Sequence, residues 1–303
     1  MPARRRAVCL LLLPAVAATA SPAGAAEPPI PFAPHRAVYD IVLDRASSGS
    51  GVVELTGRMV YELQGSRCDG YTQNMRFVTR MTQQDGTEQV NDLRTSSWED
   101  VVARRLRFSS TQIRDSKQVE KTSGDARDDA TDAGIKVAIE EPDKREMTLP
   151  EGAYFPMRHS EALVAAARAG ESRLVADLYD GSEKGEKLYT TSAVIGPLTE
   201  SGAPDVPEQL ATRATLSAVP SWPVSIGYFE PKALGRDSVP SYELSFRIYA
   251  NGVSSRLLID YGDFSVRGEL TELTYYPASE CPDSAGSSAV PLVAPPKDAA
   301  PKP

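Results

Sequence analysis

The chain has 303 residues, among them 21 glycines and 24 prolines, and its formal net charge is −8 at pH 7. Glycine and proline both disfavour the interior of long helices, so the composition excludes a mostly helical bundle. The acidic balance argues against nucleic acid and anionic membrane surfaces as partners, because both attract positive patches. Hydrophobic residues make up 41% of the chain, which suffices for a folded core and excludes wholesale disorder.

Residues 1–26 have the pattern of a secretory signal peptide. Three arginines at 4–6 precede an apolar stretch at 7–20, and small residues at 23–25 form a cleavage site. The apolar stretch is shorter than the roughly 20 residues that span a bilayer, and no second run approaches that length. We therefore expect export to the periplasm, loss of Cys9 with the leader, and no transmembrane segment.

Two cysteines remain after removal of the leader, Cys68 and Cys281. Thiols tend to pair in an oxidising compartment, so an intrachain disulfide is the simplest prediction. It would close a loop of 214 residues (281 − 68 + 1), and restricting the unfolded chain in this way contributes at most about 5 kcal/mol. Two free thiols or a redox pair are the alternative, although the sequence has no Cys-x-x-Cys motif.

Most of the chain alternates between apolar and polar residues with the period of a β-strand. Tyr39, Ile41 and Leu43 show this pattern near the beginning, and Asn251-Gly252 separates two such runs near the end, as in a tight hairpin. The sequence therefore predicts an all-β, mainly antiparallel fold. Strands are expected at 38–43, 52–63, 71–81, 90–98, 104–110, 136–139, 174–179, 188–195, 224–229, 242–248, 257–261 and 264–276.

One short helix interrupts the strands, between Pro156 and Gly170. Ser160 is the expected N-cap, and Gly170 the expected stop at the C-terminal end. Leu163, Ala166 and Ala167 form a narrow apolar stripe, which suggests packing against a sheet. Three segments are expected to be loops: 114–134, where ten of 21 residues are charged, 200–221, and the Pro/Ala-rich tail 283–303, which is expected to be disordered.

Motifs for catalysis, metals and cofactors are scarce. The mature chain has two histidines, His35 and His159, and no Gly-x-Ser-x-Gly elbow, so a structural role is favoured for both imidazoles. The acidic cluster at 125–132 lacks the ligand spacing of a calcium loop, and nucleotide and zinc motifs are absent from the sequence. We therefore assign no catalytic residue, metal or cofactor. A catalytic pair of carboxylates stays an open alternative, because the sequence does not give the distance between two side chains.

A weaker candidate for ligand binding lies in the strand at 104–110. Arg105 and Arg107 share one face of this strand, and Leu106 and Phe108 share the other. If the arginine face were concave, its guanidinium groups could hold an anionic glycan, a peptide carboxylate or a lipid head group. An ordinary polar outer face is the simpler interpretation. His159, flanked by Arg158 and Glu161, is the third possible ligand-facing residue.

Four segments together resemble the alphaproteobacterial cell envelope integrity protein EipB family over residues 34–281: HRAVYDIVLDRASSGSGVVELTGRMVYELQGSRCDGY, FPMRHSEALVAAARAGE, LYDGSEKGEK and YELSFRIYANGVSSRLLIDYGDFSVRGELTEL. The resemblance implies one periplasmic domain, here 27–282, built as a spiral-like, broken β-barrel with one helix and one disulfide between Cys68 and Cys281. It also implies a part in envelope integrity and stress resistance, and a link to a periplasmic tetratricopeptide-repeat protein. The family brings no catalytic residues.

These observations predict a non-catalytic periplasmic protein that binds or scaffolds an envelope component, with a peptide, glycan or lipid as the possible ligand. One alternative is a lipid or lipoprotein carrier, which would have an apolar tunnel lined by residues such as Met75 and Phe77. Another is a carboxylate-based envelope hydrolase, which would have two acidic side chains facing each other in the concavity.

Overall fold

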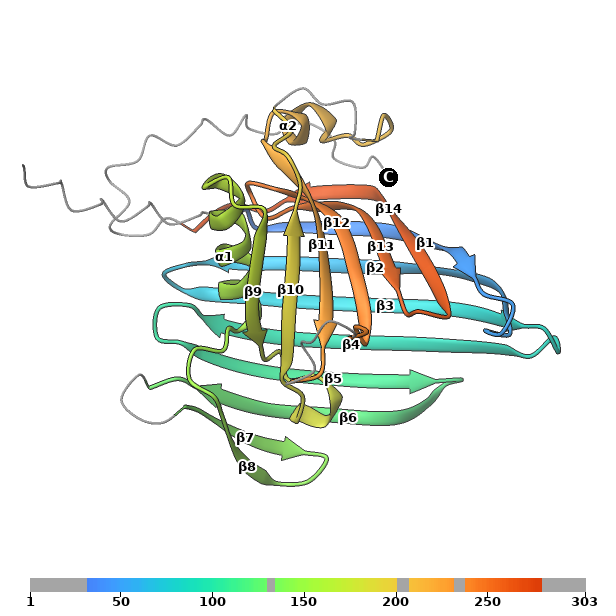
Figure 1. The fold of residues 1–303 in the computed structure, drawn as a ribbon, viewed down its shortest axis with the longest axis horizontal. Helices are drawn as coiled ribbons and strands as arrows, with labels where there is room; N and C mark the ends of the chain where they lie inside the picture. Colours follow the sequence, from blue (N-terminus) through green and yellow to red (C-terminus); the bar gives the residue numbers. More distant parts are fainter. Residues whose placement is uncertain (1–31, 130–133, 201–206, 232–237, 280–303) are drawn as a thin grey trace, which may run out of the picture.

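Fourteen antiparallel strands form one sheet in the computed structural model, which describes residues 32–129, 134–200, 207–231 and 238–279 (Figure 1). The strand order is β8-β7-β6-β5-β4-β3-β2-β1-β14-β13-β12-β11-β10-β9. Strands adjacent in the sheet are consecutive in the chain except at one position, where β1 pairs with β14.

The strands are β1 (His35–Ala46), β2 (Val52–Ser66), β3 (Gly70–Gln83), β4 (Glu88–Asp100), β5 (Arg105–Arg114), β6 (Lys117–Arg127), β7 (Ile135–Glu141), β8 (Arg145–Leu149), β9 (Arg173–Leu178), β10 (Tyr189–Ile195), β11 (Ser221–Phe229), β12 (Tyr242–Tyr249), β13 (Ser254–Asp260) and β14 (Phe264–Tyr275). The helices are α1 (Pro156–Arg168), α2 (Arg213–Ser217) and the 3-10 turn η1 (Glu183–Gly185).

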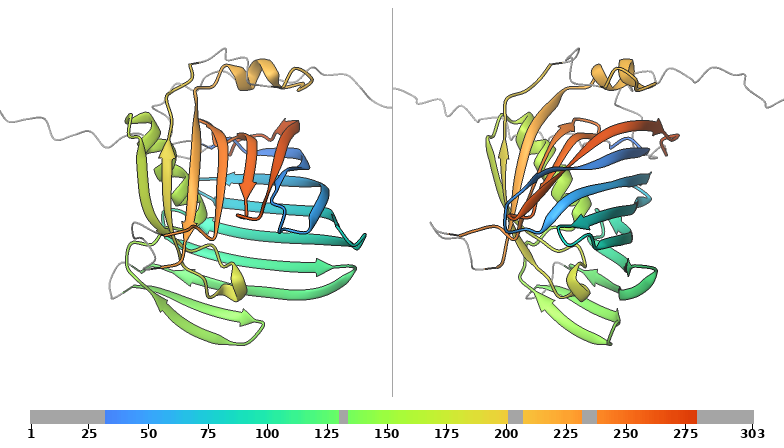
Figure 2. Two further views of the ribbon diagram at one scale, coloured as in Figure 1. Left: turned by 45° about the vertical axis from the view of Figure 1, so that its right-hand side comes forward. Right: turned by 90° about the vertical axis from the view of Figure 1, so that its right-hand side faces the viewer.

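The sheet curls so that its second half crosses in front of its first half. Figure 1 shows β2–β6 running across the molecule and β9–β12 crossing them, and the turned views in Figure 2 show the curl. The edge strands β8 and β9 do not pair with each other, so the barrel is unclosed. Between them, α1 and a single parallel bridge from Tyr154 to Leu178 connect the two edges. The predicted all-β, broken-barrel architecture is confirmed.

Helix α1 lies between the two halves of the sheet and fills much of the concave side. Its Met157, Leu163 and Val164 side chains are each at most 2% exposed. Small residues on the same helix, Ala166 and Ala167, are also buried and allow close packing. The expectation that this helix packs against a sheet is confirmed. Other buried members of the cluster are Leu63, Tyr71, Trp222, Val224 and Ile226.

The beginning of α1 differs from the prediction. The helix starts at Pro156, with Phe155 as N-cap, and Ser160 lies inside the helix, where its hydroxyl donates to the Pro156 carbonyl at 2.9 Å. Proline suits the first helical position because its φ is preset and its missing N–H would lack a helical partner there. The predicted stop is confirmed, because Gly170 has φ +76° directly after the C-cap Ala169.

Strand β6 occupies most of the segment 114–134 that was expected to be a loop, so that prediction was wrong. Its backbone pairs with β5 on one side and β7 on the other. Its inward positions carry the small residues Thr122, Gly124 and Ala126, and a Cβ at Gly124 would lie 2.7 Å from Cζ of Phe108. The inner face is thus covered by a neighbour's ring, which leaves β6 without the apolar alternation that identifies strands in a sequence.

Two further differences concern short elements. The prediction of one helix was incomplete, because α2 and η1 are also present, and α2 lies in the segment 200–221 that was expected to be a loop. The Leu216 side chain of α2 is fully buried in a cluster with Tyr39 and Leu270, so apolar packing holds α2 in place. Strand β8 was not predicted. The leader 1–26, Cys281 and the tail 283–303 lie outside the described residues.

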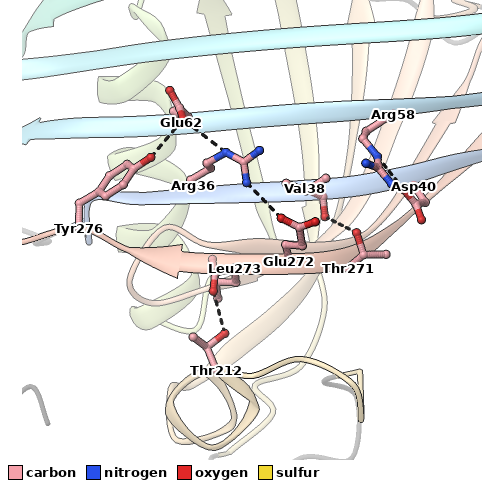
Figure 3. A network of polar contacts seen from close by, with 10 residues as sticks. All are labelled: Arg36, Val38, Asp40, Arg58, Glu62, Thr212, Thr271, Glu272, Leu273 and Tyr276. Carbon is pink, nitrogen blue, oxygen red and sulfur yellow. Dashed lines mark hydrogen bonds and ion pairs between the residues drawn. The ribbon is translucent and has the colours of Figure 1, made fainter. Parts of the chain in front are cut away.

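The seam between the first and last strands is held by side chains as well as by the backbone (Figure 3). Arg36 on β1 donates to Glu272 on β14 at 3.2 Å and forms an ion pair with Glu62 on β2 at 3.5 Å. Tyr276, just after β14, donates to the same Glu62 carboxylate at 3.1 Å. These contacts place the end of β14 beside the end of β2.

The connection between β9 and β10 folds back onto the inner face of β5–β7. Gly181 has φ +76°, and a Cβ there would lie 2.3 Å from ring carbons of Phe108. Gly185, at the end of η1, comes similarly close to Ile139, and Tyr179 Oη donates to the Gly185 carbonyl at 2.8 Å. Close packing and a left-handed backbone therefore both require glycine at 181.

Replacing Gly181 with alanine should lower the free energy of unfolding by about 2–4 kcal/mol, since strain at positive φ adds to overpacking against Phe108. Gly86→Ala is the matched control: Gly86 has φ +82°, but no atom lies within 4 Å of the position that a Cβ would take, so about 1 kcal/mol should be lost. Urea unfolding of both variants measures the difference. Equal losses would contradict the packing argument.

Candidate functional site

The N-terminus of α1 is held by a carboxylate from a distant strand. The N-cap residue Phe155 offers no side-chain acceptor, and the first turn contains no acidic residue. Glu99 on β4 takes this role: Oε2 accepts the Met157 N–H at 2.6 Å, and Oε1 accepts the Arg158 N–H at 3.0 Å. A carboxylate at this end also interacts favourably with the helix dipole. Glu99 thus satisfies two backbone donors that would otherwise lack partners.

Glu99 is a fully buried acid. Burial raises the pKa of its carboxyl to about 7, although the N–H groups of Met157 and Arg158 favour the charged form. The nearby carboxylate of Glu161 raises this pKa further. The Glu99 carboxyl therefore titrates near neutral pH, although it is buried against the end of a helix.

His159 directly follows Arg158 in α1 and is also buried. Its Nε2 is 3.0 Å from Thr191 Oγ1, and that hydroxyl donates its hydrogen to the Ala176 carbonyl at 2.9 Å. The hydroxyl oxygen must then accept from His159, which places the imidazole hydrogen on Nε2. Burial lowers the pKa of His159 to about 4, so it is neutral at physiological pH. The residue bonds to the sheet at Thr191, as a structural histidine does.

Another polar residue of α1, Glu161, fixes the turn between β2 and β3. Glu161 forms an ion pair with Arg67 of this turn at 2.6 Å, and its side chain is 14% exposed. Cys68 is the next residue of the same turn. Glu99 and Glu161, the two acids at this helix, are therefore bound to the α1 backbone and to Arg67 respectively.

Arg105 and Arg107 lie on the convex, outer face of β5. Their neighbours Leu106 and Phe108 point inward and are 0% and 6% exposed, whereas both arginines are exposed. Arg107 lies over the ring of Trp98, with its guanidinium carbon 5.7 Å from the ring centroid. The structure therefore brings neither arginine near His159, and their position fits the simpler interpretation of a polar outer face.

A second acid with a raised pKa, Asp180, is partly buried in the connection between β9 and β10. Its Oδ1 accepts the Ser182 N–H at 2.9 Å, and burial raises the pKa of its carboxyl. Three tyrosines stand near it, on β10, β11 and β12. Their rings contact one another: Tyr228 and Tyr242 are stacked 4.3 Å apart, and Tyr189 meets both edge-on.

Sequence reasoning missed Glu99 and Asp180, and the signals for them differ. Asp180 belongs to the LYDGSEKGEK segment, so the family resemblance could have identified it. Glu99 occupies an inward position of β4, opposite Tyr71 and Leu106, but Ser97 and Thr95 on the same face of the strand are polar, so the sequence carries no local signal for it. Met75 and Phe77 lie on the inner face of β3 and are partly buried.

Across the ranges that the structure describes, no group of three His, Cys, Asp or Glu side chains is placed to hold a metal ion. In the same ranges, none of the helices has both the length and the apolar character needed to cross a bilayer.

These features define a class of protein: an unclosed, curled antiparallel sheet with its own helix held in the concavity by a buried carboxylate. The chain belongs to the EipB-like family, whose model matches residues 26–277. It is 38% identical over 254 residues to the cell envelope integrity protein EipB of Brucella abortus (strain 2308), a match that covers 84% of this chain and 88% of that protein. A crystal structure from Brucella abortus, described as a beta-barrel-like protein of a domain of unknown function (DUF1849), superposes with a TM-score of 0.75 at 36% identity and covers 82% of this chain and all of that one.

Replacing Glu99 with glutamine should change how stability depends on pH. A folded-state pKa of about 7, above the unfolded value of 4.5, makes the wild type lose stability as pH rises from about 4.5 to 7, by about 3 kcal/mol at most. Glutamine does not titrate, so the stability of wild type relative to Glu99→Gln should fall by this amount between pH 4.5 and pH 8. Urea unfolding at several pH values measures the difference.

Glu88→Gln is the control for this comparison, because Glu88 lies at the exposed start of the same strand and pairs with Arg80 only at 3.6 Å. Its stability relative to wild type should show little of this pH dependence. A constant difference between wild type and Glu99→Gln across the pH range would contradict the burial of a titrating carboxyl at the helix end.

Proposed function

We propose that this chain acts in the periplasm as a non-catalytic protein that maintains cell envelope integrity by binding or scaffolding an envelope component. The observation that carries the proposal is the match to the Brucella abortus relative named for envelope integrity, which covers 88% of that protein. A periplasmic tetratricopeptide-repeat protein is the partner that the family resemblance suggests.

The contacts of the buried titratable groups support a non-catalytic role. Glu99 binds the amides of α1, His159 bonds to Thr191, and Asp180 accepts the Ser182 N–H. Glu99 and His159 thus each fix one structural element to another, and Asp180 stabilises the turn in which it lies. A general acid or base needs instead to reach a proton on a bound substrate.

The proposed disulfide between Cys68 and Cys281 is supported by the seam. Cys68 lies in the turn after β2, and the end of β14 is held beside β2 through Tyr276 and Glu62. The Tyr276 N–H also donates to the Pro34 carbonyl at 2.8 Å. Cys281 follows Tyr276 by five positions, a length of chain that reaches at most about 17 Å.

Cys68→Ser should lower the melting temperature in oxidising buffer, because the unfolded chain would lose its cross-link. Wild-type protein treated with reductant under conditions that expose the bond should melt at the temperature of the variant. Differential scanning calorimetry of both proteins with and without reductant measures this. Wild type that is unchanged by reductant would contradict the pairing.

Deleting the gene in its native host should sensitise cells to detergent and to cell-wall antibiotics, and the full chain should restore resistance. The same chain without residues 1–26 should stay in the cytosol and fail to restore it, although it is produced in equal amount. Restoration by the leaderless chain would argue against a periplasmic role. Native mass spectrometry that finds an acyl chain bound to periplasmic protein would support the carrier alternative instead.

A further inference from the structure

An open pocket of about 420 Å³ lies where β6, the turn between β7 and β8, and η1 meet. Strand β6 contributes Glu120 and Lys121, the end of β7 and the turn after it contribute Glu141 and Asp143, and η1 contributes Lys184. The volume falls in the range of small-ligand sites. Three segments that are distant in the sequence therefore bring charges of both signs to one concavity.

Most of the charge in this pocket is uncommitted. Lys121 and Glu141 form an ion pair at 2.8 Å and largely neutralise each other. Within the described residues, Glu120, Asp143 and Lys184 form no ion pair and no side-chain hydrogen bond. Two carboxylates and one ammonium group thus remain available to a ligand.

The backbone that presents Lys184 is held in an unusual conformation. Lys184 has φ +60° and Glu183 has φ +47°, values that residues other than glycine rarely adopt. Such strain persists only where the surroundings enforce it. Here a Cβ at Gly185 would lie 3.1 Å from the Ile139 side chain, so the backbone packs closely against it, and the Gly185 carbonyl accepts the Tyr179 hydroxyl. The backbone at Lys184 is therefore fixed relative to β6 and β7 before any ligand binds.

We infer that this pocket binds a short peptide with a free amine and a free carboxylate, as the stem peptides of peptidoglycan carry. The amine would lie between Glu120 and Asp143, and the carboxylate would pair with Lys184. Val119 and Pro142, which also line the pocket, would contact the aliphatic part of the peptide. This inference rests on the proposed function for the periplasmic location, and it names a ligand class for the proposed binding role.

The test is isothermal titration of the purified protein with the tripeptide L-Ala-γ-D-Glu-meso-diaminopimelic acid at low salt. Lys184→Asn removes the positive charge while keeping a residue that tolerates positive φ, and Glu120→Gln removes one negative charge. Each variant should bind about fivefold more weakly than wild type. Acetylating the amines of the tripeptide should weaken binding to wild type similarly.

Lys144→Gln is the matched control, because Lys144 is exposed and follows Asp143 directly but does not line the pocket. Its affinity should stay within about twofold of wild type. The inference is overturned if wild type does not bind the tripeptide, if the pocket variants bind it as wild type does, or if Lys144→Gln loses as much affinity as they do. Restored resistance in the deletion strain tests the proposed function separately, so a failed titration leaves that result intact.

Discussion

The contact between Glu99 and the N-terminus of α1 is the interaction on which the interior of this protein depends. A curled sheet with an apolar inner face must fill its concavity, and a helix placed there brings unpaired amide groups into a region without water. Glu99 accepts two of these amides from a fully buried position. Because α1 also links β8 to β9, fixing its end fixes where the two edges of the sheet stand relative to each other.

The same constraint explains why the barrel stays open. In a closed barrel, β8 and β9 would pair, and the interior would have to be filled by side chains alone. Here α1 stands at the gap between the edges, and a bridge runs from Tyr154, which follows β8, to Leu178 on β9. The sheet is also held at the seam, where β1 pairs with β14 and Arg36 links three strands. Seam and helix together determine the curl.

Many of the buried polar side chains of this protein hold parts of the fold together. Glu99 and His159 connect elements that are distant in the chain, whereas Asp180 accepts the N–H of Ser182 in its own turn, and the shifted pKa values of all three follow from burial. Perturbed pKa values often mark active sites, but structural contacts perturb them too. Free charges of both signs meet instead at the pocket beside β6, on a surface that the helix and the core do not use.

The alternation of apolar and polar residues was sufficient to predict β1 to β3 and the final hairpins, because their inward residues are large and apolar, such as Tyr39 and Leu270. It failed for β6, whose inward residues Gly124 and Ala126 are small because the Phe108 ring occupies the space. The C-terminal end of α1 could also be predicted, because Gly170 is a local signal. The group that binds its N-terminus could not, because Glu99 lies 58 positions away from Met157 in the chain.

The sequence alone therefore determined what depends on neighbouring residues: the strands with strong alternation, the helix stop, and the opposite faces of Arg105 and Leu106. Only the tertiary structure decided which of those faces is concave, which acid meets the helix, and which charges gather in one pocket. The physical reason is that curvature and long-range contacts arise from packing between distant segments, and local periodicity carries no information about them.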